Sequence, residues 1–357
     1  MDDRVESSTE AMAANMAMEA RAGKGKADGE ELPLVTFALF AYNQEKYIRE
    51  AVEGALAQDY PNLEIILSDD CSLDNTFNVM CESTKNYSGC HQVKLNRNSV
   101  NLGLGSHVNK VVAQSKGELI VLAAGDDISA INRVSRLVEK WRSLPGCVAV
   151  CSDSLVISGA GEEQNVMAGS PFRGSLDKGV ACYFSGVHGC AYAWTKQIFD
   201  VFGEMLQDTI CEDRVVPLRD ALLGNTGYVA EPLVKYRVHG SNISHFFATD
   251  PTKVMEKTIS IHARNLVIQQ NYVRDLQKAI TLGMEPEVEI SLALRAATNQ
   301  VSLLAAKIQF LQHGLIRKLQ LIAWSATRHP KQCLRWIAIV VAPHAYLRNQ
   351  MKNLGVD

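Results

Sequence analysis

The stretch that decides the fold is Leu34-Val-Thr-Phe-Ala-Leu-Phe40, because stretches of the same kind recur twice further along the chain. The recurrences are Leu63-Glu-Ile-Ile-Leu67 and Leu119-Ile-Val-Leu-Ala123. Each is a short, almost entirely apolar run, which is typical of a strand buried on both faces of a sheet.

The segments between these runs follow a helical period. Helices are predicted over 45–58, from the N-cap candidate Asp74 to Met80, and over 107–113, with a short strand over 93–95 between the last two. Strands that alternate with helices form a parallel sheet covered on both faces. We therefore predict an α/β fold, a Rossmann-like three-layer sandwich around a mostly parallel sheet.

The composition is that of an ordinary globular protein. The chain has 357 residues, of which 47% are hydrophobic and 21% charged, and its net charge is −3. A charge so close to neutral gives no reason to expect nucleic acid as a partner. The nine cysteines contain no Cys-x-x-Cys pair, so we expect reduced thiols of a cytoplasmic protein rather than a structural zinc site.

The chain divides into three predicted parts. Residues 1–31 are rich in charge and offer little to bury, so a disordered tail is expected. Residues 32–248 carry the strand and helix pattern, and 249–357 form a helical C-terminal region. Trp336 to Leu347, the longest uncharged apolar stretch near the end, is too short for a membrane span.

The last part of the helical region is basic. Residues 310–357 carry seven Lys and Arg against one Asp, interleaved with Leu, Ile, Trp and Val. This pattern suits a helix on an anionic membrane surface, through residues 310–350. A solvated basic face on helices that pack against the sheet domain, or self-association, are the alternatives.

Polar clusters follow the predicted strands. Tyr42-Asn43 follows the first strand, Asp69-Asp70 the second and Asp126-Asp127 the third. In open α/β sheets, ligands bind where these strand ends meet. Carboxylates gathered there repel one another, and a divalent cation such as Mn²⁺ or Mg²⁺ relieves that repulsion. Caps and turns are the alternative role for such residues, most of all for Asp74.

In their order and spacing, the motifs of residues 34–127 resemble those of the nucleotide-sugar-binding half of the inverting GT-A glycosyltransferases of family 2. The motifs are Val35 to Tyr42-Asn43, Tyr47-Ile48, Ala57-Gln58-Asp59-Tyr60-Pro61, Glu64-Ile65-Ile66, Asp69-Asp70-x-Ser72-x-Asp74-Asn75-Thr76, Asn101-Leu102-Gly103-Leu104-Gly105, Asn109, Lys116-Gly117-Glu118 and Asp126-Asp127. A second cluster is similar to the acceptor half of the family: Glu212-Asp213, Pro217-Leu218-Arg219 and Glu231-Pro232-Leu233-Val234-x-Tyr236-Arg237-x-His239-Gly240. The resemblance covers residues 34–245.

The resemblance implies a GT-A fold for residues 32–248 and a role for each matching donor-side residue. Those placed on the nucleotide sugar are Phe40, Ala41, Tyr42, Asn43, Asp70, Asn101, Gly103 and Asp126. Among them Asp70 is expected to accept a hydrogen bond from the base imide, and Asp69 to be a buried carboxylate that shapes the loop.

A metal site is implied in the same way. Asp127 and Asp126 form the metal-binding pair, with Asp127 nearest the cation, and His239 is a further candidate ligand. Many relatives carry an additional Asp two residues before this pair. That position is Ala124 here, which predicts a leaner site for Mn²⁺ or Mg²⁺.

On the acceptor side, the resemblance makes Asp213 the general base and Glu212 the residue that supports or orients it. A base is needed because an acceptor hydroxyl is a poor nucleophile at neutral pH. An acidic helix start, favoured by the helix dipole, is the alternative for this pair. His188, Gly189 and Asp153 are candidates for contact with the acceptor.

The function that the resemblance implies is that of an inverting glycosyltransferase, of the EC 2.4 class. It would move a sugar from a UDP-, dTDP- or GDP-sugar to a glycan or lipid-linked glycan in surface polysaccharide biosynthesis, as a cytoplasmic protein peripheral at the inner face of the membrane. A non-catalytic scaffold that binds sugar nucleotides or glycans is one alternative. A sugar nucleotidyltransferase is another, but it needs a glycine-rich triphosphate loop, and Leu34 to Asn43 has none.

Overall fold

The computed structural model describes residues 31–169, 188–240, 242, 254–312 and 315–341. All but the last residue of the predicted tail therefore lies outside the described residues. The first half alternates strands and helices, as predicted: β1 (Val35–Ala41), α2 (Ile48–Leu56), β2 (Leu63–Asp69), α3 (Thr76–Thr84), β3 (Gln92–Arg97), α4 (Leu104–Gln114) and β4 (Leu119–Ala124).

The second half of the sheet domain is less regular. It contains β5 (Ile128–Ser129), α5 (Arg133–Ser143), β6 (Cys147–Ser158), β7 (Glu163–Met167), the short 3-10 helix η3 (Gly189–Ala191), β8 (Tyr192–Thr195), α6 (Gln197–Phe202), α7 (Glu212–Leu223) and β9 (Asn225–Val238). The strands form one sheet in the order β3-β2-β1-β4-β8-β6-β9-β5, and β7 pairs with β6.

Strand direction changes once the sheet passes β4. Strands β3, β2, β1 and β4 are parallel to their neighbours, whereas β8 runs antiparallel to both β4 and β6. Beyond β8, β6 and β9 are parallel again. The predicted α/β sandwich around a mixed, mostly parallel sheet is confirmed.

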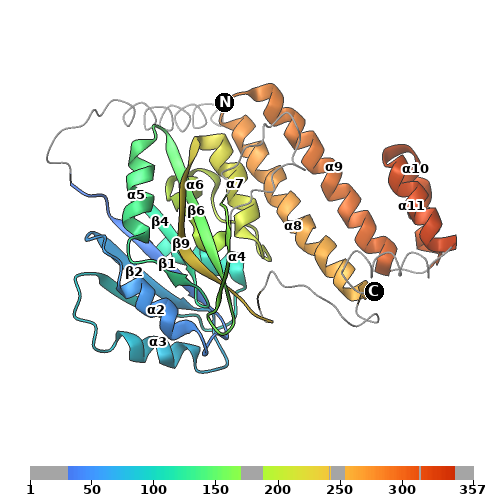
Figure 1. Ribbon diagram of the computed structural model, residues 1–357. Helices are drawn as coiled ribbons and strands as arrows, with labels where there is room; N and C mark the ends of the chain where they lie inside the picture. The colour runs from blue at the N-terminus through green and yellow to red at the C-terminus, as the bar shows by residue number, and fades with distance from the viewer. Residues whose placement is uncertain (1–30, 170–187, 241, 243–253, 313–314, 342–357) are drawn as a thin grey trace.

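Two apolar cores cover the two faces of the sheet. Successive side chains of a strand point to opposite faces, and in β1 Phe37 and Leu39 belong to one core while Ala38 and Phe40 belong to the other. The first core packs the sheet against α2 and α5, the second against α4, α6 and α7. This arrangement gives the three layers seen in Figure 1.

The C-terminal region is helical, as predicted, and consists of α8 (Val254–Thr281), α9 (Glu287–Gln312), α10 (Leu315–Arg328) and α11 (Pro330–Val341). Tyr272 and Leu276 of α8 belong to the same core as α7. Beside them Arg219 of α7 forms a buried ion pair with Asp275 of α8, with 2.7 Å between Nε and Oδ2. The base of the helical region is therefore continuous with the sheet domain.

The helices α10 and α11 lie at the other end of the α8–α9 hairpin (Figure 1). They have a small core of their own with the end of α9, in which the rings of Phe310 and Trp336 stack at 4.7 Å. None of the helices in the described ranges is both long and apolar enough to cross a bilayer.

Candidate active site

Asp126 and His239 meet at the edge of the sheet. Asp126 follows β4 and His239 follows β9, and His239 Nε2 lies 3.0 Å from Asp126 Oδ2. The imidazole also stacks on the ring of Tyr47, just before α2, at 4.7 Å. Three segments that are distant in the sequence thus build one centre, of which sequence analysis had given no role to Tyr47.

Asp127 points into the protein. Its Oδ1 accepts a 2.8 Å hydrogen bond from the backbone N–H of Arg237, and its carboxylate also receives the thiol of Cys190. Burial, and next the charge of Asp126, raise the pKa of Asp127 to about 7. Its carboxyl is therefore engaged by interior groups.

Two buried arginines hold this edge together. The guanidinium of Arg237 donates from Nε to the carbonyl oxygen of Asp126 at 2.9 Å and from Nη2 to Glu50 at 2.9 Å. Arg133 donates to the carbonyl oxygens of Leu122 and Cys190, so it ties β4 to η3. Burial lowers the pKa of Arg133 to about 10, which leaves it a cation at neutral pH. Neither role was predicted.

Asp70 organises the loop before α4. Its Oδ1 accepts hydrogen bonds from Asn98 at 2.7 Å and from the backbone N–H of Leu102 at 2.9 Å, and its Oδ2 accepts from Gly103 N–H at 3.0 Å. Gly103 adopts φ 76°, a left-handed conformation that favours glycine. Asn101 Oδ1 accepts from the same Gly103 N–H.

The last two residues of β1 are buried, whereas the two residues that follow the strand are exposed. Phe40 and Ala41 are 9% and 3% exposed, whereas Tyr42 is 41% exposed. Asn43 is exposed with φ 52°, and its side chain accepts a 2.8 Å hydrogen bond from the N–H of Leu73. Phe40 and Ala41 are buried because both faces of β1 are covered. Tyr42 and Asn43, which follow the strand, are therefore the two side chains of this segment that a ligand can reach.

The second carboxylate centre, at the start of α7, consists of Glu212, which is buried, and Asp213, which is half-buried. Burial raises the pKa of Glu212 to about 8, with the charge of Asp213 as the next cause, and burial raises the pKa of Asp213 to about 6. The charges of Arg214 and of Arg264, from α8, pull the pKa of Asp213 the other way. Sequence analysis missed Arg264 because α8 lies outside the family resemblance.

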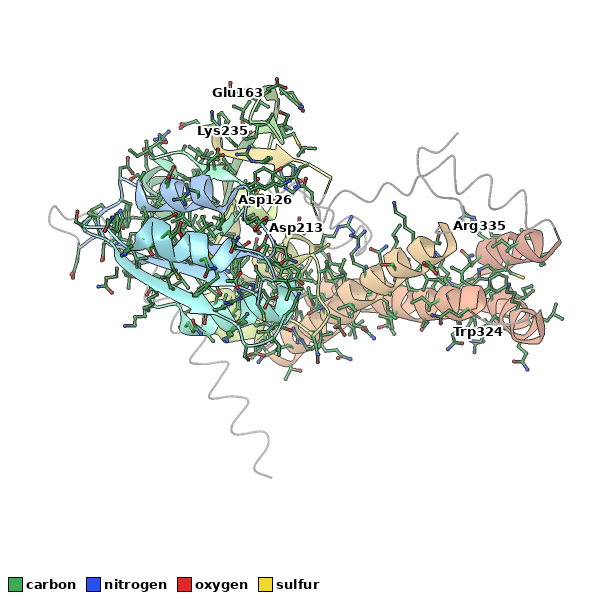
Figure 2. The ribbon with its side chains drawn as sticks, turned by 90° about the horizontal axis from the view of Figure 1, so that it is seen from below. Asp126, Glu163, Asp213, Lys235, Trp324 and Arg335 are labelled. Atoms are coloured by element: carbon green, nitrogen blue, oxygen red, sulfur yellow. The ribbon has the colours of Figure 1, made fainter. Side chains whose placement is uncertain are left out.

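Gly189 covers this pair. Its backbone forms a hydrogen bond with Asp213, and a Cβ added to Gly189 would stand 2.1 Å from Glu212 Oε1. The thiol of the next residue, Cys190, forms a hydrogen bond with Asp127, the neighbour of Asp126. The short helix η3, which contains Gly189 and Cys190, therefore links the two carboxylate centres. Figure 2 shows Asp126 and Asp213 in the same part of the sheet domain.

The other two acceptor-side candidates have structural contacts. His188 stacks on Tyr236 of β9 at 5.6 Å, and burial lowers its pKa. Asp153 in β6 accepts hydrogen bonds from Gly169 N–H at 2.7 Å and from Tyr228 Oη at 2.6 Å. His188 is thus next to Gly189, while the carboxylate of Asp153 is held within the sheet.

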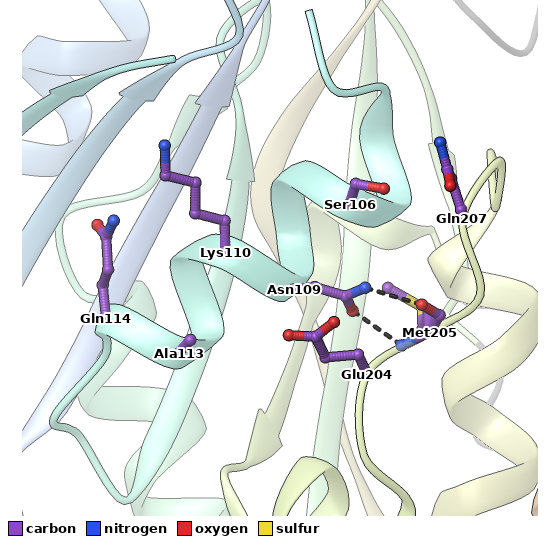
Figure 3. A pocket seen from close by; sticks show the side chains of 8 residues that line it. All are labelled: Ser106, Asn109, Lys110, Ala113, Gln114, Glu204, Met205 and Gln207. Atoms are coloured by element: carbon purple, nitrogen blue, oxygen red, sulfur yellow. Dashed lines mark hydrogen bonds between the residues drawn. The ribbon is translucent and has the colours of Figure 1, made fainter. Parts of the chain in front are cut away.

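A separate cavity of about 520 Å³ lies between α4 and the segment 204–207 (Figure 3). Asn109, one of the residues that carry the resemblance, lines it and bonds both the N–H and the carbonyl of Met205, at 2.9 and 2.8 Å. Its role is to fix this segment to α4. None of the predicted donor, metal, base or acceptor residues lines this cavity.

Comparisons with known proteins show similarity to one family of enzymes. Residues 36–178 match the family model described as Glycosyl transferase family 2. EpsE of Bacillus subtilis (strain 168), which is named as a glycosyltransferase, is 32% identical over 152 residues, or 41% of this chain and 52% of EpsE. An uncharacterised glycosyltransferase of Nostoc sp. is 24% identical over 263 residues, or 71% of this chain and 79% of that protein.

The crystal structure of TarS from S. aureus has a similar fold, with a TM-score of 0.53 at 15% identity. The match covers 90% of this chain and 54% of TarS. This chain therefore spans about half the length of EpsE and of TarS. The likeness agrees with the predicted GT-A fold.

Proposed function

We propose that this chain, whose residues 36–178 match the model of Glycosyl transferase family 2, is an inverting glycosyltransferase that uses a nucleoside-diphosphate sugar. The observation that carries the proposal is the pair of carboxylate centres joined through Gly189 and Cys190. One centre, Asp126 with His239, suits the diphosphate end of a donor, and the other, Glu212 with Asp213, suits an acceptor hydroxyl.

The reaction is a single displacement at the anomeric carbon. Asp213 accepts the proton of the acceptor hydroxyl as its oxygen forms a bond to the anomeric carbon. The bond from that carbon to the phosphate oxygen breaks on the opposite face, and its electron pair leaves with the nucleoside diphosphate. Attack opposite the leaving group inverts the anomeric configuration.

The pKa values support Asp213, rather than Glu212, as the base. A general base works best when its pKa lies near the working pH. Burial raises the pKa of both carboxyls, and the charges of Arg214 and Arg264 lower the pKa of Asp213 alone, so Asp213 is the more readily ionised of the two. A proton held by this coupled pair therefore favours Glu212, and the negative charge favours Asp213.

The chemistry of the donor set fits a divalent cation. One carboxylate oxygen and one imidazole nitrogen stand 3.0 Å apart at Asp126 and His239, and imidazole favours Mn²⁺ over Mg²⁺. Within the described residues no group of three such side chains could hold a metal, so the diphosphate and water would complete the coordination. Such an ion supplies positive charge to the leaving diphosphate.

This geometry favours Asp126 over Asp127 as the ligand, the reverse of the order that the sequence suggested. The Asp127 carboxyl already receives Arg237 N–H and the Cys190 thiol. The Asp127 carboxyl is also close to the buried cation Arg133, whose charge lowers its pKa.

On the donor side, we propose that the base lies over Tyr42 and the loop held by Asp70. Three hydrogen bonds already reach the Asp70 carboxylate, which leaves acceptor capacity on Oδ2 for a base imide. The acceptor, a glycan or lipid-linked glycan, and a role in surface polysaccharide biosynthesis are proposed from the family resemblance alone.

The test is calorimetric binding of UDP, dTDP and GDP with Mn²⁺ and then with chelator, followed by an assay for nucleoside diphosphate released from the matching sugar donor. We expect one nucleotide to bind, chelation to weaken it, and Asp126→Asn to weaken it similarly. If the folded protein binds none of the three, the donor site is refuted and a non-catalytic role takes its place.

A further inference from the structure

Charge is strongly segregated along this chain. Residues 290–357 contain nine Lys and Arg and one acidic residue, Asp357, which gives a net charge of +8. Residues 1–289 contain 27 Lys and Arg against 38 Asp and Glu, a net charge of −11. The near-neutral total therefore conceals a basic C-terminal region attached to an acidic domain.

The fold carries this basic region to one place. Helices α8 and α9, of 28 and 26 residues, are each about 40 Å long at 1.5 Å per residue. At their far end stand α10 and α11, and Figure 2 shows Trp324 and Arg335 there, away from Asp126 and Asp213. We call α10 and α11 the tip.

The tip has a buried side and an outer side. Cys333, Trp336 and Ile339 of α11 are buried, at helical spacing, toward α9 and α10. The opposite side of α11 exposes Leu334 and Ile337, with exposed fractions of 70% and 41%. Large apolar side chains that no described neighbour covers need a partner in the assembled system.

Basic side chains flank these apolar residues. On α11, Lys331 is exposed one turn before Leu334, and Arg335 is exposed between Leu334 and Ile337. Arg328 is exposed at the end of α10, with its guanidinium 5.5 Å from the ring of Trp324. On α10, Leu319 is 53% exposed next to Lys318. A face of aliphatic residues bordered by Lys, Arg and Trp is the kind that lies in the interface of a membrane.

The positive charges where α11 lies close to α9 also favour an anionic partner. Burial, and next the charge of Arg335, lower the pKa of Lys307. Burial, and next the charge of Lys307, lower the pKa of His262 on α8 to about 4. Lys307 and Arg335 are therefore close enough to interact, and two neighbouring cations produce a positive potential, which attracts an anionic surface.

We propose that the tip is a docking surface for an anionic lipid membrane, with Leu334 and Ile337 inserted among the headgroups and Lys331 and Arg335 facing lipid phosphates. The apolar part favours a membrane over nucleic acid, and the excess of positive charge on both helices favours it over a second copy of the same face. The α8–α9 hairpin then holds the sheet domain near the membrane. This inference does not depend on the proposed glycosyl transfer.

The test is flotation of the full chain with vesicles of phosphatidylcholine alone and of phosphatidylcholine with phosphatidylglycerol in equal parts. The wild type should bind the anionic vesicles, and less so as salt rises. Lys331→Glu with Arg335→Glu should lower the partition coefficient at least about tenfold. Leu334→Ser with Ile337→Ser should lower it at least about fivefold.

A matched control is Lys85→Glu with Lys278→Glu, which makes the same change in charge at exposed positions away from the tip. It should bind like the wild type, and circular dichroism should show all variants folded. Equal binding to both vesicle types, or loss in the control equal to that in the tip variant, overturns the proposal. So does a dimer that Leu334→Ser with Ile337→Ser abolishes, or binding to duplex DNA stronger than to vesicles.

Discussion

His239 Nε2 lies 3.0 Å from Asp126 Oδ2, although 113 positions separate the two residues in the chain. The contact depends on β9 returning to the edge of the sheet where β4 ends. Arg237, two residues before His239, strengthens this return through its backbone bond to Asp127 and its side-chain bond to the Asp126 carbonyl. The site is therefore built by the last strand of the sheet domain as much as by the first four.

The first prediction separates the two adjacent aspartates. Asp126→Asn should weaken nucleotide binding in Mn²⁺ by at least about tenfold, or 1.4 kcal/mol, because it removes the charge that faces the cation. Asp127→Asn should keep the Mn²⁺ dependence, since the Asp127 carboxyl faces Cys190 and Arg237. Titration calorimetry with and without chelator measures both. The assignment fails if Asp127→Asn alone abolishes the effect of Mn²⁺.

The second prediction separates the members of the acidic pair. Asp213→Asn should lower kcat by about 10² to 10⁴-fold, the usual contribution of a general base. Glu212→Gln should cost far less, because the proton of the coupled pair favours Glu212 and Gln has the charge of the protonated form. Steady-state release of nucleoside diphosphate gives both values. A larger loss in Glu212→Gln than in Asp213→Asn would exchange the two roles.

The third prediction concerns Arg264 of α8. Its positive charge lowers the pKa of Asp213, so Arg264→Gln should raise that pKa. The acid limb of the pH profile of kcat should then move to higher pH. The loss of kcat should be larger below pH about 7 and smaller above it. Lys278→Gln, which removes the same charge from an exposed position further along α8, is the control and should leave the profile in place.

Whether a feature of this structure can be predicted from the sequence depends on whether the interactions that produce it are local or distant along the chain. The strands 34–40, 63–67 and 119–123 were predictable because a strand covered on both faces is apolar throughout, and a local pattern records that. The position of Asp126 and Asp127 after β4 follows from the same pattern. The different partners of the two carboxylates, His239 for Asp126 and both Cys190 and Arg237 for Asp127, do not follow from it, because these partners are far away in the sequence.

The helical region marks another limit. Its helices could be predicted from their period, but the burial of Arg219 against Asp275 and the approach of Arg264 to Asp213 depend on how α8 docks onto α7. Arg219 belonged to the family motif without a role, and the structure supplies one, a buried ion pair beneath Phe199 and Phe202. Such pairs form between elements whose contact no single segment specifies.

The last prediction concerns stability at Asp220, on the buried side of α7. It is fully buried, and neither carboxylate oxygen has a hydrogen-bond partner among the residues that the structure describes. Burial raises its pKa well above the ordinary value. A carboxyl whose pKa is raised by folding stabilises the folded state least at high pH: its contribution is intact below the unfolded pKa, near 4, and is lost as pH rises toward the folded pKa. Asp220→Asn imitates the protonated form at every pH.

We therefore expect Asp220→Asn to unfold like the wild type near pH about 4 and to exceed it in free energy of unfolding by about 1–3 kcal/mol near pH 8. Urea titrations at several pH values measure the difference, and the exposed Asp200→Asn is the control, which should show no such trend. A constant difference across the pH range would mean that Asp220 does not titrate between the folded and unfolded states. Burial of the Asp220 carboxyl would then be compensated in another way, such as by hydrogen bonds to water. Asp220→Asn would in that case gain no additional stability at high pH.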